Sequence, residues 1–324
     1  MPVPLRNFPP ISAGLLSRKT RYPTGMKVLL IGGSGFVGTA IAELFLSRRD
    51  RVTVNSRGNK PLIGGVEPLV ADRKNAAAFA AAMAGHTFDL AIDLTAFSAG
   101  DVSAVAPAIA GKVGHYVLIS TDFVYSTDIE SFPISEDAPK DPHSGYSTGK
   151  LSAEAAMIAA GESLKLAGSV LRPPHIMGAG KELGTTTVQG RDRNLLRSMR
   201  AGKGVTMLGE GELLLQPVWH RQIAEAIECI AGNAATFGQI MNCPGGEIVT
   251  TRRYYQLIAD RLGVPLVYDS VSVERYRAEN PDKRAFARHR IYDVSKLRNL
   301  AGYIARPQVK EAIDETVAWM EKNC

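Results

Sequence analysis

The chain has 324 residues, of which 45% are hydrophobic and 22% are charged, and this suffices for one large α/β core or two smaller ones. No apolar run reaches the roughly 18 residues that a membrane-spanning helix needs, so no membrane partner is expected. The formal net charge is +6, but the acid-free stretch 1–25 supplies four positive charges, from Arg6, Arg18, Lys19 and Arg21. The rest of the chain is close to neutral, which argues against a nucleic-acid-binding face.

Residues 1–25 predict a flexible basic N-terminal extension. They include five prolines and lack the long apolar core of a secretory signal. An organellar targeting segment, or sequence upstream of a start at Met26, would have the same character. The three cysteines, Cys229, Cys243 and Cys324, form neither a metal-ligand spacing nor an even disulfide set. The histidines do not cluster with them, so we expect no metal and a reducing, cytoplasmic location.

From Met26 onwards, strand-like runs alternate with helical patterns. Strands are predicted near 27–31, 51–54, 68–70, 90–92, 115–119 and 169–171, and helices near 37–46, 79–83, 102–109 and 151–160. This order predicts an α/β fold with a Rossmann-type, doubly wound parallel sheet over 26–178. After residue 178 the runs become short and rich in glycine and charge. We expect a smaller C-terminal α/β substrate domain or cap over 179–324, with boundaries interleaved with the first domain.

A glycine-rich turn, Gly32-Gly-Ser-Gly35-Phe-Val-Gly38, follows the first strand and opens the first helix. Gly32 suits a tight turn, Gly35 lets the backbone approach a pyrophosphate, and Gly38 lets helix and strand pack closely. The free N–H groups and positive dipole end of the helix then face the phosphates. The motif predicts a dinucleotide-binding domain. The residues expected around the cofactor are Gly32, Ser34, Gly35, Phe36, Val37 and Gly38 in the turn, with Leu94, Thr95 and Pro173 at later strand ends.

The end of the second strand indicates which dinucleotide is bound. NAD sites usually place an acid there to hold the ribose hydroxyls, whereas this chain has Arg57 followed by Gly58. An arginine pairs with a 2′-phosphate and stacks on adenine, so we expect NADP, with NAD as the alternative. The alternative that Arg57 is a solvated arginine in a loop stays open. Asp72, after the third strand, could accept a hydrogen bond from the adenine amino group or could cap a turn.

Two further motifs carry the predicted chemistry. Ser120-Thr121-Asp122 ends the fifth strand, and Tyr146-Ser-Thr-Gly-Lys150 opens a helix, with phenol and ammonium on one face. A phenol pKa near 10 must fall by about three units to act as a base at neutral pH, roughly 4 kcal/mol. Lys150 and a positive nicotinamide ring would supply that stabilisation. Thr121 would orient the substrate oxygen. A second copy of the spacing, Tyr292 to Lys296, follows no such strand and is interpreted as structural.

Together with the segment from Arg172 to Gly178, these motifs resemble the extended short-chain dehydrogenases/reductases, the NAD-dependent epimerase/dehydratase family. The resemblance runs from Met26 to the end of the chain. It implies a Rossmann domain with a small C-terminal substrate domain, and often a homodimer. It also implies the catalytic set Thr121, Tyr146 and Lys150. Substrate contacts are expected at Asp122, Phe123 and His175, with a buried structural histidine as the alternative for His175.

The chain departs from its family in ways that bear on the substrate. Sugar-nucleotide 4,6-dehydratases carry an acidic pair after Ser-Thr, but Phe123 follows Asp122 here. Where many sugar-nucleotide enzymes place a diphosphate-binding arginine and paired aspartates, this chain has Leu215 and the pair Arg221-Gln222. Other arginines could replace the missing one, namely Arg191, Arg193 or Arg221. His220 is interpreted as a scaffold histidine, with lining of the pocket as the alternative.

The resulting hypothesis is an NAD(P)-dependent oxidoreductase or epimerase that acts on a sugar-like, possibly nucleotide-linked, alcohol or ketone in carbohydrate metabolism. Tyr146 would exchange the hydroxyl proton while nicotinamide exchanges hydride. The Ser-Thr-Asp motif at residues 120–122 resembles the corresponding motif of sugar-nucleotide reductases. The alternative is a non-catalytic dinucleotide-binding regulator or an RNA-binding relative, such as the plastid RNA-binding proteins of the same fold. Those relatives tend to lose the Tyr and Lys pair that this chain keeps, so a nucleic-acid partner is not expected.

Overall fold

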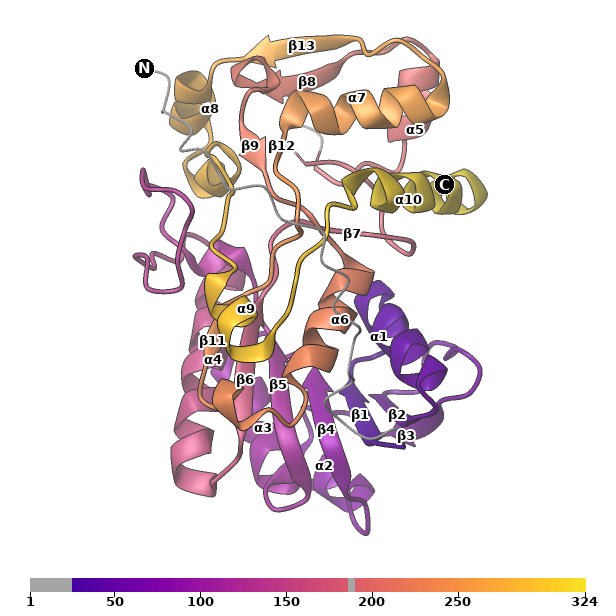
Figure 1. Cartoon of the computed structure of the whole chain (residues 1–324), viewed down its shortest axis with the longest axis vertical. Coiled ribbons are helices and arrows are strands. Elements are labelled where there is room, and N and C mark those ends of the chain that lie inside the picture. The colour runs from indigo at the N-terminus through magenta and orange to yellow at the C-terminus, as the bar shows by residue number, and fades with distance from the viewer. Residues whose placement is uncertain (1–24, 186–189) are drawn as a thin grey trace.

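The computed structural model describes residues 25–185 and 190–324, so most of the predicted N-terminal extension lies outside the described residues. Its centre is a seven-stranded sheet in which all neighbours are parallel, in the order β11-β6-β5-β4-β1-β2-β3 (Figure 1). The strands are β1 (Lys27–Ile31), β2 (Arg51–Ser56), β3 (Glu67–Val70), β4 (Phe88–Asp93), β5 (Val113–Ile119), β6 (Gly168–Arg172) and β11 (Ile240–Asn242). The order reverses direction between β1 and β4, where doubly wound sheets bind ligands.

Helices cover both faces of this sheet. In β1, Val28 and Leu30 join one core and Leu29 and Ile31 join the other, as the two-residue period of a strand requires. The first core also takes side chains from α1 (Phe36–Ser47), α6 (His220–Ile230) and α9 (Ser295–Ala301). The second takes them from α2 (Ala76–Ala82), α3 (Ala99–Ile109) and α4 (Gly145–Leu164). Burial on both faces explains why the strands are continuously apolar.

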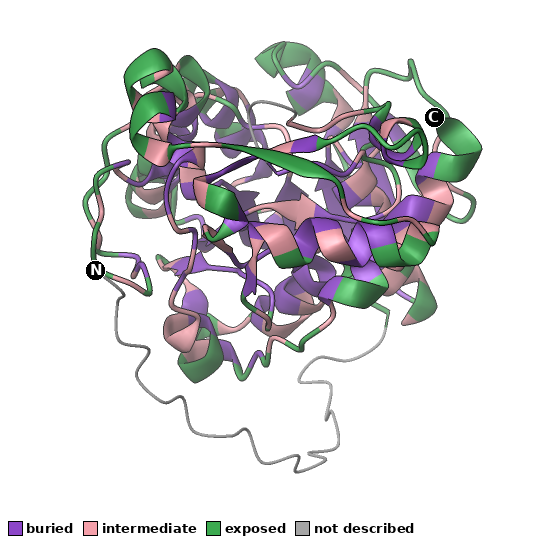
Figure 2. Ribbon diagram, turned by 90° about the horizontal axis from the view of Figure 1, so that it is seen from above, coloured by how far each residue is buried: buried purple, intermediate pink, exposed green. Residues whose placement is uncertain are grey.

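A smaller cap lies over the sheet (Figure 1) and has a third core of its own. Its helices are α5 (Leu195–Arg200), α7 (Thr251–Leu262), α8 (Val273–Glu279) and α10 (Val309–Asn323). Its strands pair two by two: β7 (Ile176–Met177) with β10 (Val218–Trp219), β8 (Val205–Leu208) with β13 (Tyr268–Val271), and β9 (Leu214–Leu215) with β12 (Val249–Thr250). Figure 2 looks onto the cap, with the largely exposed β13 outermost and buried segments beneath it.

The predicted doubly wound parallel sheet is confirmed, and the predicted elements of the first half appear in order. The chain crosses between the layers more than once after residue 178, because α6, β11 and α9 return to the sheet. The strand β11 has no counterpart among the predicted strands, since its three residues give too little periodicity to recognise. No helix among the described residues is long and apolar enough to span a bilayer.

A buried ion pair ties α4 to β6 beneath the catalytic motifs. The Arg172 side chain is 1% exposed, and it donates from Nε to Glu154 Oε1 over 2.9 Å and from Nη2 to Oε2 over 2.5 Å. The Tyr125 hydroxyl accepts a further bond from Arg172 Nη1 at 3.0 Å. Ser120 donates to the same glutamate. Because each charge is fully partnered, the network fixes the strand that carries the Ser-Thr motif.

Breaking this pair should destabilise the fold strongly. Glu154→Gln leaves the Arg172 guanidinium buried without a countercharge, and we expect a loss of about 3–5 kcal/mol in the free energy of unfolding. Urea unfolding followed by circular dichroism measures it. The double variant Glu154→Met/Arg172→Met removes both charges and should lose less than the sum of the two single changes. An unchanged midpoint for Glu154→Gln would show that the pair adds no net stability.

Candidate active site

The predicted phosphate-binding turn has the geometry its glycines suggested. Gly32 has φ +82°, and a Cβ there would lie 2.2 Å from Thr95 Cγ2. A Cβ on Gly38 would lie 2.5 Å from the Gly33 carbonyl oxygen. Gly35 is the N-cap of α1, and a Cβ there would meet nothing within 4 Å. The open space beside Gly35 and the uncapped first turn of α1 therefore fit an anionic group such as a pyrophosphate.

The ends of β2 and β3 form a surface next to this turn. Arg57 is exposed, and Gly58 has φ +78°, where a Cβ would lie 3.5 Å from Val70 Cγ1. Val70 is 65% exposed and stands beside Gly58. An exposed apolar side chain beside an arginine suits a flat heteroaromatic ring. Asp72 accepts a hydrogen bond from the Lys74 backbone N–H at 3.0 Å, so the structure records the turn-capping alternative for it.

The parallel strands bring the remaining predicted cofactor residues to the same edge. Thr95 lies against Gly32, and Leu94 follows directly after β4, its N–H donating to the Ile31 carbonyl oxygen. Pro173 follows directly after β6 and accepts a bond from the Asp122 N–H at 3.3 Å. The turn, the β4 end and the β6 end therefore surround one region.

The catalytic motifs meet where β5 ends and α4 begins. A capping box between Ser144 and Ser147 starts α4 one residue before Tyr146. The Tyr146 side chain is 45% exposed, while Thr121 is buried. Burial of the phenol raises the Tyr146 pKa, and the nearby Thr121 hydroxyl offsets part of that rise. The structure thus places the two hydroxyl groups together.

Lys150 lies one helical turn beyond Tyr146 and is buried. Its Nζ donates to the Ile119 carbonyl oxygen over 2.8 Å and lies 4.6 Å from the centre of the Phe97 ring. Desolvation lowers the Lys150 pKa to about 8, although the Asp93 carboxylate opposes that shift. A partly desolvated ammonium exerts a strong field on its surroundings, which suits a group that stabilises a phenolate.

Asp122 is held inside the protein. Arg290 donates to its Oδ2 from Nε over 3.0 Å and from Nη2 over 2.7 Å, and the Tyr292 hydroxyl donates over 2.5 Å. Thr121 Oγ1 lies 3.4 Å from Oδ1. Asp122 is 1% exposed, so its described contacts anchor the loop. Tyr292, from the second Tyr-x-x-x-Lys copy, is one of those anchors.

Phe123 forms an aromatic wall beside the tyrosine. Its ring centre lies 6.4 Å from that of Tyr146 and 5.1 Å from that of Phe286. The Arg290 guanidinium lies over the same ring at 5.2 Å. The wall joins the sheet edge to the cap segment 286–290.

The histidines that the sequence singled out point into the cap. His175 packs edge-on against Tyr254, its Nε2 has no hydrogen-bond partner among the described residues, and burial holds its pKa well below the ordinary value. His220 packs against Gly178 and Phe36. Desolvation lowers its pKa to about 4 although Glu315 lies 3.5 Å away.

The three arginines offered as diphosphate ligands have different surroundings. Arg193 donates to the Asn323 carbonyl oxygen, and Arg221 pairs with Glu315. Arg191 lies over the Phe36 ring at 5.8 Å, which puts a positive charge above the first residue of α1.

Sequence reasoning missed three residues near the wall, namely Phe286, Arg288 and Arg290. They belong to an irregular segment that packs against Phe123 and a small cavity of the cap. The alternation of Arg288, Arg290 and Tyr292 was a usable signal, because buried strand-like segments rarely alternate cations without a partner or a ligand. Within residues 25–185 and 190–324, no group of three or more His, Cys, Asp or Glu side chains is arranged to hold a metal ion.

Several known proteins are similar to this chain. It is 24% identical over 302 residues to a 2'-dehydrokanamycin reductase of Streptomyces kanamyceticus, covering 91% of this chain and 84% of that protein. It is 23% identical over 317 residues to the chloroplast stem-loop binding protein of 41 kDa b of Arabidopsis thaliana, covering 88% and 79%.

Solved structures share the fold at low identity. A UDP-glucose 4-epimerase from Thermotoga maritima superposes with a TM-score of 0.76 at 18% identity, over 92% of this chain and 99% of that one. A UDP-glucuronic acid 4-epimerase from Bacillus cereus, solved with NAD, gives 0.73 at 16% identity over the same shares. The model of the NAD dependent epimerase/dehydratase family matches residues 105–243, which include β5, α4 and both catalytic motifs. The family that the sequence motifs predicted is therefore the one whose model matches the central part of this chain.

Proposed function

We propose that this enzyme is an NADP-dependent oxidoreductase that interconverts a ketone and an alcohol on a sugar-like substrate, with Tyr146 as the general acid and base. The observation that carries the proposal is the convergence of Thr121, Tyr146 and a buried Lys150 on one edge of the sheet, next to an open glycine turn. Such a set can move a proton to or from an oxygen beside a bound nicotinamide ring.

The residues around the turn fit a dinucleotide. Gly35 and the first turn of α1 would hold the pyrophosphate, and Arg191 above Phe36 would add a positive charge to it. Arg57 would pair with a 2′-phosphate, and Val70 would pack against adenine. Leu94, Thr95 and Pro173 would line the path towards the nicotinamide end. When bound, the cofactor supplies or accepts the hydride.

The protein's own groups would handle the proton. Thr121 would donate a hydrogen bond to the substrate oxygen and orient it, while the Tyr146 hydroxyl delivers a proton to that oxygen as a ketone becomes an alcohol. In the reverse direction the phenolate takes the proton back. Lys150, one helical turn from Tyr146, would favour the phenolate because its ammonium is buried and poorly hydrated. Phe123 and Phe97 limit the access of water to the phenol.

A reductase is favoured over an internally recycling epimerase by two observations. Arg57 is an exposed cation where NAD-binding sites usually place an acid, and free NADPH is the ordinary donor for reductions. The chain is also similar over nearly its whole length to a 2'-dehydrokanamycin reductase. An RNA-binding role is the second candidate, because of the likeness to a chloroplast stem-loop binding protein. Retention of RNA that is lost with residues 1–25 and weakens with salt would support it.

The glycine turn offers a matched pair of variants. Gly35→Ala meets open space, so it should keep the melting temperature within a few degrees while weakening NADPH binding about tenfold or more, since a methyl group would stand where the phosphates approach. Gly38→Ala would collide with the Gly33 backbone and should destabilise the whole fold. Differential scanning fluorimetry and fluorescence titration with NADPH measure both. Equal loss of stability in the two variants would contradict the assignment.

Tyr146→Phe should lower the turnover number about a hundredfold or more, because it removes the only proton that the phenol can exchange, and it should leave NADPH affinity nearly unchanged.

Arg57→Ala should instead weaken NADPH binding more than NADH binding. Titrations with both cofactors, together with consumption of NADPH absorbance against a panel of keto sugars, test the pair. A fully active Tyr146→Phe variant would sink the mechanism, and equal weakening for both cofactors would remove the argument for NADP.

The depressed Lys150 pKa predicts a pH dependence of stability in the cofactor-free protein. The folded pKa is about 8 against 10.5 for the free side chain, so between these values the unfolded chain binds more protons and stability rises with pH. The full difference is on the order of 3 kcal/mol. The wild type should therefore gain stability relative to Lys150→Met as pH rises from 8 towards 10.5. Parallel urea midpoints for the two proteins across that window would show that the ammonium is not penalised.

A further inference from the structure

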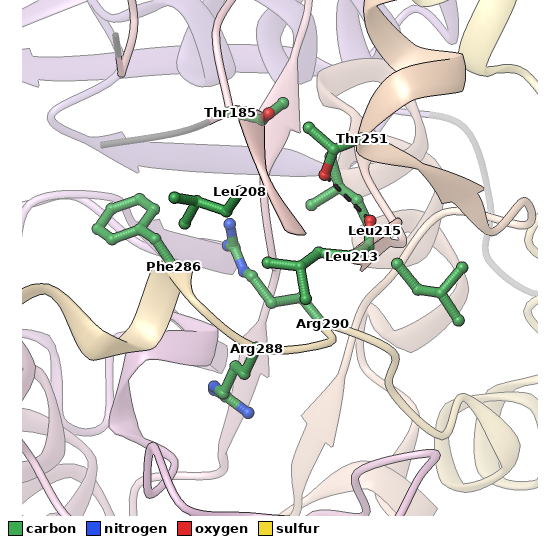
Figure 3. Close-up of a pocket in the computed structure, with 9 residues that line it drawn as sticks. Thr185, Leu208, Leu213, Leu215, Thr251, Phe286, Arg288 and Arg290 are labelled. Carbon is green, nitrogen blue, oxygen red and sulfur yellow. Dashed lines mark hydrogen bonds between the residues drawn. The ribbon is translucent and has the colours of Figure 1, made fainter. Parts of the chain in front are cut away.

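Arg73 is a buried cation that follows β3 and reaches the end of β4. It is 8% exposed, and its Nη2 donates to the Asp101 carbonyl oxygen over 2.7 Å. Its Nη1 donates both to the Asp93 carboxylate and to Thr95 Oγ1, the second over 3.1 Å. Arg73 therefore differs from Arg288 of the cap, which lines the small cavity in Figure 3 and has no hydrogen-bond partner among the described residues. The two protons of Nη1 are committed to one carboxylate and one hydroxyl.

The Asp93 carboxylate also holds the backbone after β4. Its Oδ1 accepts from the Thr95 and Ala96 N–H groups, each over 2.9 Å. The Tyr116 hydroxyl donates to Oδ2 over 2.8 Å. Asp93 is 0% exposed, and these donors, with Arg73, satisfy both of its oxygens. One buried ion pair therefore anchors both the backbone and the side chain of Thr95.

The side chain of Thr95 stands against the glycine turn. A Cβ on Gly32 would lie 2.2 Å from Thr95 Cγ2 and 2.7 Å from Thr95 Oγ1. Thr95 is half-buried, so its hydroxyl is not sealed inside the protein. The ion pair of Arg73 and Asp93 therefore holds a hydroxyl group beside the first glycine of the turn.

This hydroxyl has a proton to donate. A guanidinium only donates hydrogen bonds, so Thr95 Oγ1 is the acceptor in the bond from Arg73. Within residues 25–185 and 190–324 the Thr95 hydroxyl makes no other hydrogen bond. A cation bonded to the oxygen polarises the O–H group and makes it a stronger donor. The group that complements it is an oxygen acceptor placed next to the glycine turn.

We propose that Arg73 is a positioning residue for the dinucleotide, which fixes the Thr95 hydroxyl so that it donates a hydrogen bond to an oxygen of the ribose and diphosphate backbone. The proposal rests on the proposed function, because its ligand is the cofactor of that same site. The ribose and diphosphate oxygens are common to NADP and NAD, so this bond serves both. Arg73 acts through Thr95 and needs no contact with the cofactor.

Thr95→Val tests the proposal, because it keeps the shape of the side chain and removes the hydroxyl. Thr95→Ser keeps the hydroxyl, and Thr206→Val makes the same change at a half-buried threonine of β8 in the cap. Each full-length protein is titrated with NADPH and with NADH by fluorescence, and its melting temperature is recorded. We expect Thr95→Val to bind both dinucleotides about tenfold more weakly, the loss of one charge-assisted hydrogen bond. Thr95→Ser and Thr206→Val should stay within about twofold of the wild type.

Two results of this comparison would overturn the proposal. One is unchanged affinity in Thr95→Val. The other is a loss in Thr95→Ser as large as that in Thr95→Val, because packing of the methyl group against Gly32 would then matter and the hydroxyl would not.

Arg73→Lys tests the positioning role. It keeps a positive charge for Asp93, but an ammonium without the guanidinium fork cannot serve carboxylate, hydroxyl and carbonyl together. We expect NADPH to bind about fivefold more weakly, and Arg73→Lys/Thr95→Val to bind no more weakly than Thr95→Val alone. Losses that multiply in the double variant would overturn the proposal, since Arg73 would then act by another route. Should Arg73→Lys fail to fold, Arg73→Met/Asp93→Asn removes both charges and takes its place in the comparison.

Fragments of the cofactor locate the oxygen. Thr95→Val and the wild type are titrated with adenosine 2′,5′-bisphosphate and with the 2′-phosphate of ADP-ribose, which contains both riboses and the diphosphate. Weaker binding of both fragments supports the proposal and places the oxygen on the adenosine half. Weaker binding of the longer fragment alone supports it and places the oxygen towards the nicotinamide half. Unchanged binding of both would overturn it.

The same titrations separate this proposal from the proposed function. Failure of the wild type to bind NADPH and NADH would overturn both. Normal binding by the wild type and by Thr95→Val would overturn only the role of Arg73 and Thr95.

Discussion

The arrangement of the site depends on one buried interaction, in which Asp122 accepts hydrogen bonds from Arg290 and Tyr292. Asp122 follows Thr121 directly at the end of β5, and its two partners come from the chain that leads back from the cap. One buried carboxylate therefore fixes both the position of Thr121 and the place where the cap contacts the sheet. Separating Asp122 from Arg290 or Tyr292 would leave a buried charge or hydroxyl group without its hydrogen-bond partner. Moving the cap away from the sheet would therefore cost free energy. This coupling explains why cap side chains form part of the wall around Tyr146.

Desolvation shapes the chemistry of the same region. Lys150 is surrounded by Phe97 and the backbone of β5, and its ammonium is less stable there than in water. A nearby anion would relieve that penalty. Under the proposed function, the developing phenolate of Tyr146 is such an anion, so one cause would account for both the lowered pKa of Lys150 and the activation of Tyr146. The field of Lys150 is also preorganised, because the Ile119 carbonyl holds its position before any substrate arrives.

The sequence allowed the sheet and its cofactor edge to be predicted, because those features depend on local patterns. Continuous apolar strands, helical spacing and glycines in a tight turn each leave a signature within a few residues. The alternation of Arg288, Arg290 and Tyr292 indicated a buried segment, but no local pattern could show that Arg290 contacts Asp122, which lies 168 positions away in the chain. For the same reason Asp122 was expected to meet the substrate, whereas its described contacts are with the protein. Asp72 had two open roles, and only the fold could show that it closes a turn.

Three of the buried arginines, Arg172, Arg290 and Arg288, differ in how their charge is compensated among the described residues. Arg172 is paired with Glu154 and Arg290 with Asp122, and each pair joins elements that must stay together. Arg288 has comparable burial and no described partner, so the folded protein bears a cost that a methionine there would avoid.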